Sequence, residues 1–265
     1  MIICRKELKR AAGSWCMCTF ALVFIQSFIC LFLFPVVKEQ ISTVNDAMEN
    51  VEKIVGALGM DYLNLDEITD FYGLVCGMVL GIGGGLFAAI KGTCILEAEA
   101  ENNTADFLLT FPISRAAVLT QKLFALFIQV IALNAVVVGM GLVTSKILNE
   151  SLEMYGFVLL HIAYLVMQLE ISSICFGISA FVETGGGVIG MAFAAVLYLM
   201  NMIYNISGNA GFLKYVTPYA YCGVGKIFSQ TKIQLELVGI GIAVGLIGII
   251  AAYLEYAQKD ISATD

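Results

Sequence analysis

The stretch Glu97–Arg115, EAEAENNTADFLLTFPISR, interrupts a sequence that is otherwise strongly apolar. It begins with acidic and polar residues and ends in a short apolar run that Pro112 breaks. Apolar runs flank it on both sides, GLVCGMVLGIGGGLFAAI at 73–90 and LFALFIQVIALNAVVVGMGLV at 123–143. Runs of this length and composition are typical of membrane-spanning helices. The sequence therefore predicts that this polar stretch is the loop between two membrane spans.

The composition of the whole chain is that of an integral membrane protein. Of its 265 residues, 60% are hydrophobic and 13% are charged, whereas about a quarter of the residues of soluble domains are charged. A helix needs about 20 mostly apolar residues to cross a bilayer. Windows of this kind predict an all-α integral membrane protein with six transmembrane helices. They are Trp15–Val37, Phe71–Ile90, Leu123–Val143, Gly156–Phe181, Gly185–Tyr204 and Leu237–Tyr256.

The N-terminal segment 1–14 carries the basic motif RKELKR. The apolar run that follows it is too long for a signal peptide and lacks a small-residue cleavage site, so we interpret it as a retained span. Apolar residues alternate with basic ones in the segment, which favours an amphipathic helix on the cytoplasmic lipid surface. A simple basic flank that orients the first span is the other interpretation, and both stay open.

The basic residues before the first span also predict the orientation of the chain. The positive-inside rule places them in the cytoplasm, and six spans then bring both termini to that side. The segment 91–117 is cytoplasmic in this arrangement, while the loop 38–70 and the segment 207–232 are external. The external loop holds eight acidic residues against Lys38 and Lys53. It is expected to contain some helix, near residues 42–58, and the chain 1–265 forms one transmembrane domain.

Glycines recur every four residues in the second predicted span. A four-residue spacing places them on one helix face, where another backbone can approach closely. The partner of that face is either another helix of the same chain or a second copy. The residues are Gly73, Gly77, Gly81 and Gly85.

The fourth predicted span is the most polar of the six. His161 and Gln168 lie on one stripe of this helix, and Glu170 projects from roughly the opposite side. A carboxylate in the membrane is costly, so Glu170 is expected to face protein or water. Two roles remain open for it, a hydrogen bond between helices or a part in a gate, a pathway or a protonation step.

Catalytic and metal-binding motifs are missing from the sequence. The chain has one histidine, no HExxH motif and no intramembrane pair of aspartates, so we expect neither catalytic residues nor a metal site. A phosphate-binding GxxxxGK[ST] motif is also absent. The cysteines form no CxxC pair, and we interpret them as apolar packing residues.

The polar stretch itself predicts a short helix with an exposed apolar patch. Asn103 or Thr104 can cap the helix, an acidic residue favours its first turn, and a proline ends it after about two turns. Ser114 then caps the helix that leads into the third span. A short, capped helix of this kind suits docking to another protein. The alternative is a hairpin at the lipid interface without a partner.

The order of these features resembles that of ABC-2 type permeases, the membrane subunits of bacterial ABC exporters. The similarity rests on NTADFLLTFPISR with Lys122 after it, the basic N-terminal segment, YVTPYAYCGVGKIF before the sixth span and YAQKDI at the C-terminal end. Asn103 stands where the family often has glycine. The resemblance implies that the polar stretch is a short cytoplasmic coupling helix that contacts an ATPase. The implied coupling residues are Thr104, Asp106, Phe107, Leu108, Phe111, Pro112 and Arg115.

The resemblance further implies a transport subunit without its own ATPase. Such a chain binds no cofactor, and partner ATPase subunits bind ATP and magnesium. The expected partners are those subunits, a second permease copy or paralogue, and membrane lipids, with no nucleic acid. Permeases of amphipathic peptide toxin or bacteriocin exporters are similar, so the expected substrate is such a peptide or another small hydrophobic compound.

Two other classes of function stay open from the sequence. An ion-coupled secondary transporter would use the carboxylate of Glu170 to couple ion movement to transport. A non-transporting membrane sensor or scaffold would account for the acidic external loop without a pathway.

Overall fold

A computed structural model of the chain describes residues 2–41, 56, 63–101, 114–207 and 210–258. These residues form helices and their connections, with no strand among them. The long elements are α1 (Ile2–Glu39), α4 (Ile68–Cys76), η1 (Gly77–Gly84), α5 (Gly85–Glu101), α7 (Arg115–Ile147), α8 (Met154–Ser179), α9 (Gly186–Ile206) and α11 (Leu235–Gln258). Three short ones, η2 (Gly211–Tyr215), η3 (Pro218–Tyr221) and α10 (Val224–Gln230), lie between α9 and α11.

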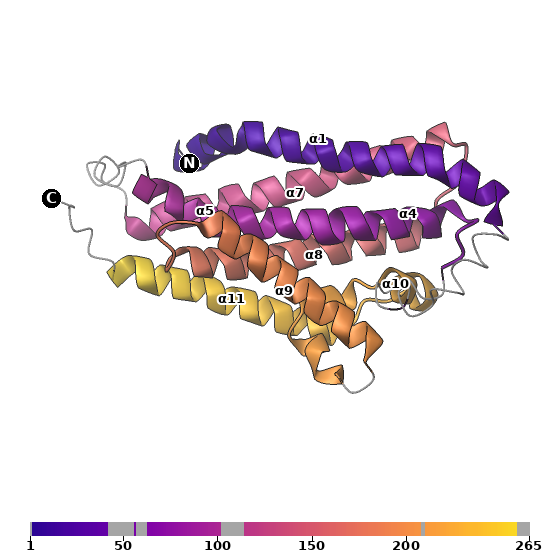
Figure 1. The fold of residues 1–265 in the computed structure, drawn as a ribbon. Coiled ribbons are helices and arrows are strands. Elements are labelled where there is room, and N and C mark those ends of the chain that lie inside the picture. Colours follow the sequence, from indigo (N-terminus) through magenta and orange to yellow (C-terminus); the bar gives the residue numbers. More distant parts are fainter. Residues whose placement is uncertain (1, 42–55, 57–62, 102–113, 208–209, 259–265) are drawn as a thin grey trace.

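Six helical stretches within the described residues are long and apolar enough to cross a membrane. Each overlaps one predicted window, and α4, η1 and α5 together form the second stretch, Ile68–Glu97. The prediction of an all-α membrane protein with six spans is therefore confirmed. The long helices lie side by side, and the start of α1, the end of α5, the start of α7 and the end of α11 share one end of the bundle (Figure 1). We call this the inner end and the opposite one the outer end.

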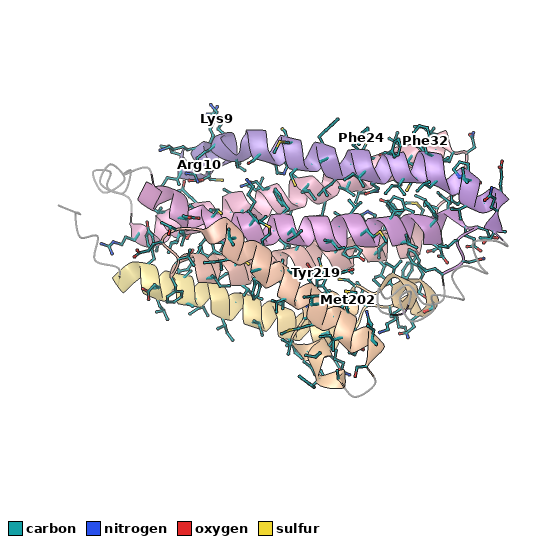
Figure 2. The ribbon with its side chains drawn as sticks, in the orientation of Figure 1. Lys9, Arg10, Phe24, Phe32, Met202 and Tyr219 are labelled. Atoms are coloured by element: carbon teal, nitrogen blue, oxygen red, sulfur yellow. The ribbon has the colours of Figure 1, made fainter. Side chains whose placement is uncertain are left out.

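Helix α1 joins the predicted interfacial segment and the first span without a break. Ile3, Cys4 and Glu7 are buried, whereas Arg5 and the other basic residues of the motif are exposed. The basic side chains of these turns thus lie on the exposed side of α1. Further along, an apolar face of α1 is exposed, and Phe24 and Phe32 point away from the bundle (Figure 2).

The centre of the bundle is α8. Of its most apolar 18-residue window, 61% is buried, compared with 17% for α1 and for α11. It packs most extensively on α11 and α5, and it also contacts α7 and α4. Helix α9 packs on α5, and α1 packs on α7. The most polar span is therefore enclosed by the others.

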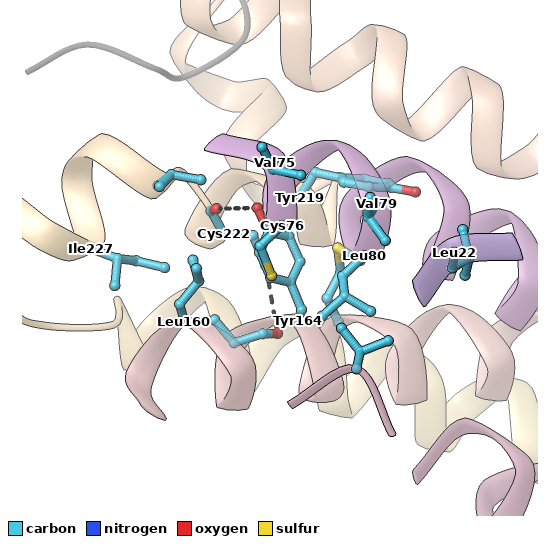
Figure 3. Packing of buried hydrophobic residues seen from close by; sticks show 14 of the residues in the cluster. Leu22, Val75, Cys76, Val79, Leu80, Leu160, Tyr164, Tyr219, Cys222 and Ile227 are labelled. Atoms are coloured by element: carbon cyan, nitrogen blue, oxygen red, sulfur yellow. Dashed lines mark hydrogen bonds between the residues drawn. The ribbon is translucent and has the colours of Figure 1, made fainter. Parts of the chain in front are cut away.

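The segment between α9 and α11 enters the bundle instead of lying over its outer end. Residues 217–222 are buried, which the sequence analysis does not predict. Figure 3 shows Tyr219 and Cys222 among buried residues of the second span and α8. Thr217 Oγ1 donates to the Leu197 carbonyl at 2.9 Å, and Tyr164 Oη donates to the Cys222 carbonyl at 3.1 Å. Irregular backbone enters a membrane protein only where such partners exist, so we call 210–234 the re-entrant segment.

Helices α8 and α11 approach so closely that a side chain would not fit between them at Gly177. A Cβ atom there would lie 2.6 Å from the Gly248 carbonyl oxygen and 2.8 Å from the Gly248 Cα atom. Backbone atoms cannot rotate aside, so any side chain at Gly177 must push the two helices apart. Small residues at such contacts are the usual basis of helix packing in membranes.

Replacing Gly177 by alanine is expected to destabilise the bundle by about 1–3 kcal/mol, the typical cost of overpacking. Thermal unfolding of the purified protein in detergent measures the effect as a lower midpoint. The matched control is Gly239→Ala on α11, where a Cβ atom would meet nothing within 4 Å. Equal midpoints for the two variants would contradict the packing argument.

Candidate functional site

The polar side chains of α8 reach neighbours on two of its sides. His161 and Gln168 face the second span, and Glu170 faces α11 and the re-entrant segment. The structure thus separates the polar stripe from the carboxylate, which lie on different sides of one helix.

His161 belongs to a chain of hydrogen bonds across α1, α4 and α8. Its Nδ1 lies 2.8 Å from the Phe157 carbonyl oxygen, and a carbonyl only accepts, so Nδ1 carries the proton. Nε2 then accepts from Tyr72 Oη at 3.2 Å. Tyr72 Oη in turn accepts from Gln26 Nε2 at 2.7 Å. The Nε2 atom of His161 therefore links α8 to α4, while its Nδ1 atom is used within α8.

Gln168 binds the backbone of the second span where that span changes its winding. Residues Gly77–Gly84 form a π-helix, and Gln168 Nε2 donates to the Leu80 carbonyl within it at 3.0 Å. Gln168 Oε1 accepts from Asn134 Nδ2 of α7 at 2.7 Å. Helices of this type are often found at functional sites. The π-helix was not predicted from the sequence, and the dense glycines of this span were the one sequence signal of an unusual backbone there.

The four spaced glycines of the second span face side chains of this same chain. A Cβ atom at Gly73 would overlap Phe228 and Val224, and one at Gly85 would overlap the Tyr219 hydroxyl. Gly77 and Gly81 face Tyr164. The glycine face therefore receives the re-entrant segment and α8, so it is occupied within one subunit.

Glu170 is a buried carboxylate with an incomplete set of partners. Its residue is 3% exposed, and Oε2 accepts from Tyr221 Oη at 2.8 Å. Oε1 has no hydrogen-bond partner among the described residues. Burial raises the pKa of Tyr221, which keeps its hydroxyl protonated as a donor. A buried carboxylate in a membrane protein is costly, so the hydrogen bond from Tyr221 offsets only part of the cost of burying Glu170.

The carboxylate borders a small pocket of about 30 Å³ between α8, α11 and the re-entrant segment. Lys214, Thr217 and Gly241 line this pocket together with apolar residues. Gly241 has no side chain, and a Cβ atom there would overlap the carboxylate. The close approach of α11 to Glu170 therefore depends on this glycine.

Most of the predicted coupling residues lie outside the residues that the structure describes. Arg115 is described, and its Nη1 donates to the Tyr256 carbonyl of α11 at 3.4 Å. Ser114 caps α7 as the sequence predicts, because its side chain accepts from the Ala117 amide at 3.3 Å. The coupling residues outside the described parts are Thr104, Asp106, Phe107, Leu108, Phe111 and Pro112.

Lys122 lies inside the bundle. Its side chain is fully buried between α7, α5 and α1. Elsewhere in the described parts of the chain, no three His, Cys, Asp or Glu side chains come close enough to hold a metal ion.

The helices and the polar network define a polytopic α-helical membrane protein whose polar residues are gathered on one central helix. The family model described as "ABC-2 family transporter protein" matches residues 1–261, and the chain belongs to this family. No curated protein and no solved structure gives a significant match. The chain is therefore a membrane permease component of an ABC transporter, a kind of subunit that generally works with ABC ATPases and is itself non-catalytic.

The variant Glu170→Gln is expected to transport nearly as well as the wild type. Glutamine keeps the size of the side chain and an acceptor for Tyr221 while it removes the charge. Transport measured in proteoliposomes across a range of pH tests this expectation. A loss of transport would instead show that the carboxylate gates the pathway or carries a proton. The variant Tyr221→Phe is the control, because it removes the hydrogen bond and keeps the carboxylate. Loss of this hydrogen bond should lower the free energy of unfolding by about 1 kcal/mol.

Proposed function

We propose that the chain is the membrane-spanning permease subunit of an ATP-driven ABC exporter. Two permease copies, or this chain and a paralogue, form the pathway, and separate ATPase subunits bind at the inner end. Both termini and the inner end lie in the cytoplasm. The substrate is an amphipathic or antimicrobial peptide, or another small hydrophobic compound.

The observation that carries this proposal is the family match, which extends over nearly the whole chain. It leaves no room in these residues for a separate ATPase domain, and the sequence has no phosphate-binding GxxxxGK[ST] motif. ATP and magnesium are therefore bound by the partner subunits. The basic N-terminal turns of α1 support a cytoplasmic inner end by the positive-inside rule.

In this proposal the permease works by changing conformation rather than by chemistry. ATP-driven closure of the partner subunits moves the coupling segment, and the helices attached to it change the access of the pathway. Such a transition needs contacts that differ between two states. The π-helical stretch Gly77–Gly84 and the Glu170–Tyr221 hydrogen bond are contacts that a moderate helix displacement would alter.

A cationic peptide as substrate is supported by charge. The predicted external loop 38–70 has a net charge of about -6 by its sequence, and a field of this sign attracts cations leaving the membrane. Most of this loop lies outside the described residues, so the argument rests on composition. The exposed apolar face of α1 is also compatible with a substrate that enters from the inner leaflet.

Copurification is the direct test of the subunit assignment. The tagged chain is expressed with the ATPase subunit encoded beside it, and the detergent extract is purified on the tag. A stable complex whose ATP hydrolysis needs the ATPase subunit supports the proposal. A chain that never retains the ATPase subunit would contradict it.

The second candidate is an ion-coupled transporter, which the buried carboxylate of Glu170 favours. The energy source that drives transport distinguishes the two candidates. Transport that follows an imposed proton or sodium gradient and ignores ATP would support the second, whereas transport that needs ATP inside the vesicle supports the first.

Replacing Phe107 and Phe111 together by serine is expected to weaken ATPase binding at least tenfold. Buried aromatic side chains often dominate an interface, and truncating one can cost about 2 kcal/mol or more of binding free energy. The six spans should still insert. Binding is measured by titrating the ATPase subunit onto the permease in nanodiscs. The control replaces Phe212 and Tyr215 by serine, because these exposed aromatic residues belong to η2, far from the coupling segment in the chain. Normal binding and transport in the Phe107 and Phe111 variant would refute the docking role.

Neutralising the acidic external loop is expected to lower the cells' tolerance of a cationic amphipathic peptide at low salt. The measurement compares growth with a peptide of lysine and leucine at low and high salt. Charges on an exposed loop are screened beyond about 10 Å at 0.1 M salt, so the effect should shrink as salt rises. Tolerance that is unchanged at both salt levels would remove electrostatics from the substrate proposal. The altered residues are Asp46, Glu49, Glu52, Asp66 and Glu67.

A further inference from the structure

One turn of α7 near its start is bonded to three other helices. The turn consists of Thr120, Gln121 and Lys122, and it follows the coupling segment closely in sequence. Consecutive residues on an α-helix point about 100° apart, so the three side chains leave α7 in three directions. We call this turn and its partners the inner junction.

Lys122 connects α7 to α5 and α1. Its side chain is 0% exposed, and Nζ donates to the Ile95 carbonyl of α5 at 2.7 Å. Nζ also lies 3.6 Å from Glu7 Oε1 of α1, and Glu7 Oε2 pairs with Arg10 at 2.7 Å. A buried ammonium group is tolerated only when its partners are well placed. The position of Lys122 is therefore fixed by two helices besides its own.

Gln121 and Thr120 make the other two connections. Gln121 Oε1 accepts from the Ile3 amide at 3.1 Å, and this amide belongs to the first turn of α1, which lacks partners within its own helix. Thr120 Oγ1 lies 2.7 Å from Tyr253 Oη of α11. Through these bonds, α1 and α11 are each attached to the same turn of α7.

The junction closes the cytoplasmic hairpin at its base. Ile95 precedes the coupling segment in the chain and Lys122 follows it, so their hydrogen bond joins the two helices on which that segment is carried. A displacement of the segment must therefore move α5 and α7 together or break a buried bond. The same displacement pulls on α1 and α11 through the neighbouring side chains.

We propose that Thr120, Gln121 and Lys122 are positioning residues that transmit movement of the coupling segment to α11, α1 and α5 respectively. The inference rests on the proposed function, because it needs an ATPase that moves this segment. It goes further by assigning one residue to each helix. The Thr120 assignment is independent of the other two, whereas Gln121 and Lys122 both contact α1.

Hydrogen exchange on the complete complex in nanodiscs tests these assignments. Amide exchange is compared between the nucleotide-free complex and the complex trapped with ATP and vanadate. Peptides from the inner ends of α1, α5 and α11 report local opening. In the wild type, trapping should change the exchange of all three ends together with the start of α7.

Each variant should remove the response of its own partner helix. In Thr120→Val, amide exchange at the inner end of α11 should no longer change on trapping. In Gln121→Leu, the inner end of α1 should no longer respond. In Lys122→Met, the inner end of α5 should no longer respond, and the response of α1 should be weaker. Lys122→Arg keeps the charge and should restore part of the α5 response. The matched control is Gln129→Met, because this buried side chain of α7 donates to the Ala125 carbonyl of its own helix. The control should respond like the wild type.

Two results would overturn the inference. One is a wild-type response confined to α7, and the other is a wild-type pattern in all three variants. If Lys122→Met fails to fold, the half-buried Thr120 and Gln121 variants decide the question alone. Failure of the wild-type chain to bind any ATPase subunit would instead refute the proposed function, and it is measured first in the same preparation.

Discussion

The bilayer core offers no hydrogen-bond partner to a polar side chain, and this constraint explains why α8 lies at the centre. His161, Gln168 and Glu170 each find a partner on a different neighbour, namely Tyr72 of α4, the Leu80 carbonyl of η1 and Tyr221 of η3. At the edge of the bundle at least one of these groups would face lipid. The arrangement of the other helices around α8 therefore follows from satisfying its polar groups.

Close approach of backbones is the second requirement, and glycine provides it. The glycine face of the second span leaves room for Tyr164 and for the re-entrant segment. On the other side of α8, Gly177 and Gly248 bring α11 within backbone contact. Because the α8–α11 contact joins backbone to backbone without large interlocking side chains, the position of α11 depends strongly on the few polar bonds around it, such as the one between Thr120 and Tyr253. Those bonds are thus the natural places for two conformations to differ.

The sequence was sufficient to predict the spans, because a run of apolar residues has few other stable structures in a membrane. It also predicted the cap at Ser114 and the inward position of polar residues on α8. It did not predict the burial of 217–222 or the π-helix, since both depend on partners far away in the chain, such as Tyr164 and Gln168. Lys122 was missed for the same reason. Nothing in its local sequence reveals that Glu7 and the Ile95 carbonyl converge on it.

Helix α11 gives the inner junction a continuous route to the re-entrant segment. At one end Tyr253 contacts Thr120, and further along Gly241 faces Glu170, which holds Tyr221. A helix transmits displacement along its axis because its backbone bonds are stiff, whereas its glycine contacts with α8 resist sliding weakly. A shift of α11 at the inner end would therefore change the space beside the Glu170 carboxylate. Coupling of this kind requires two discrete arrangements of the same element, and the Glu170–Tyr221 bond is one contact that can be present in one arrangement and absent in the other.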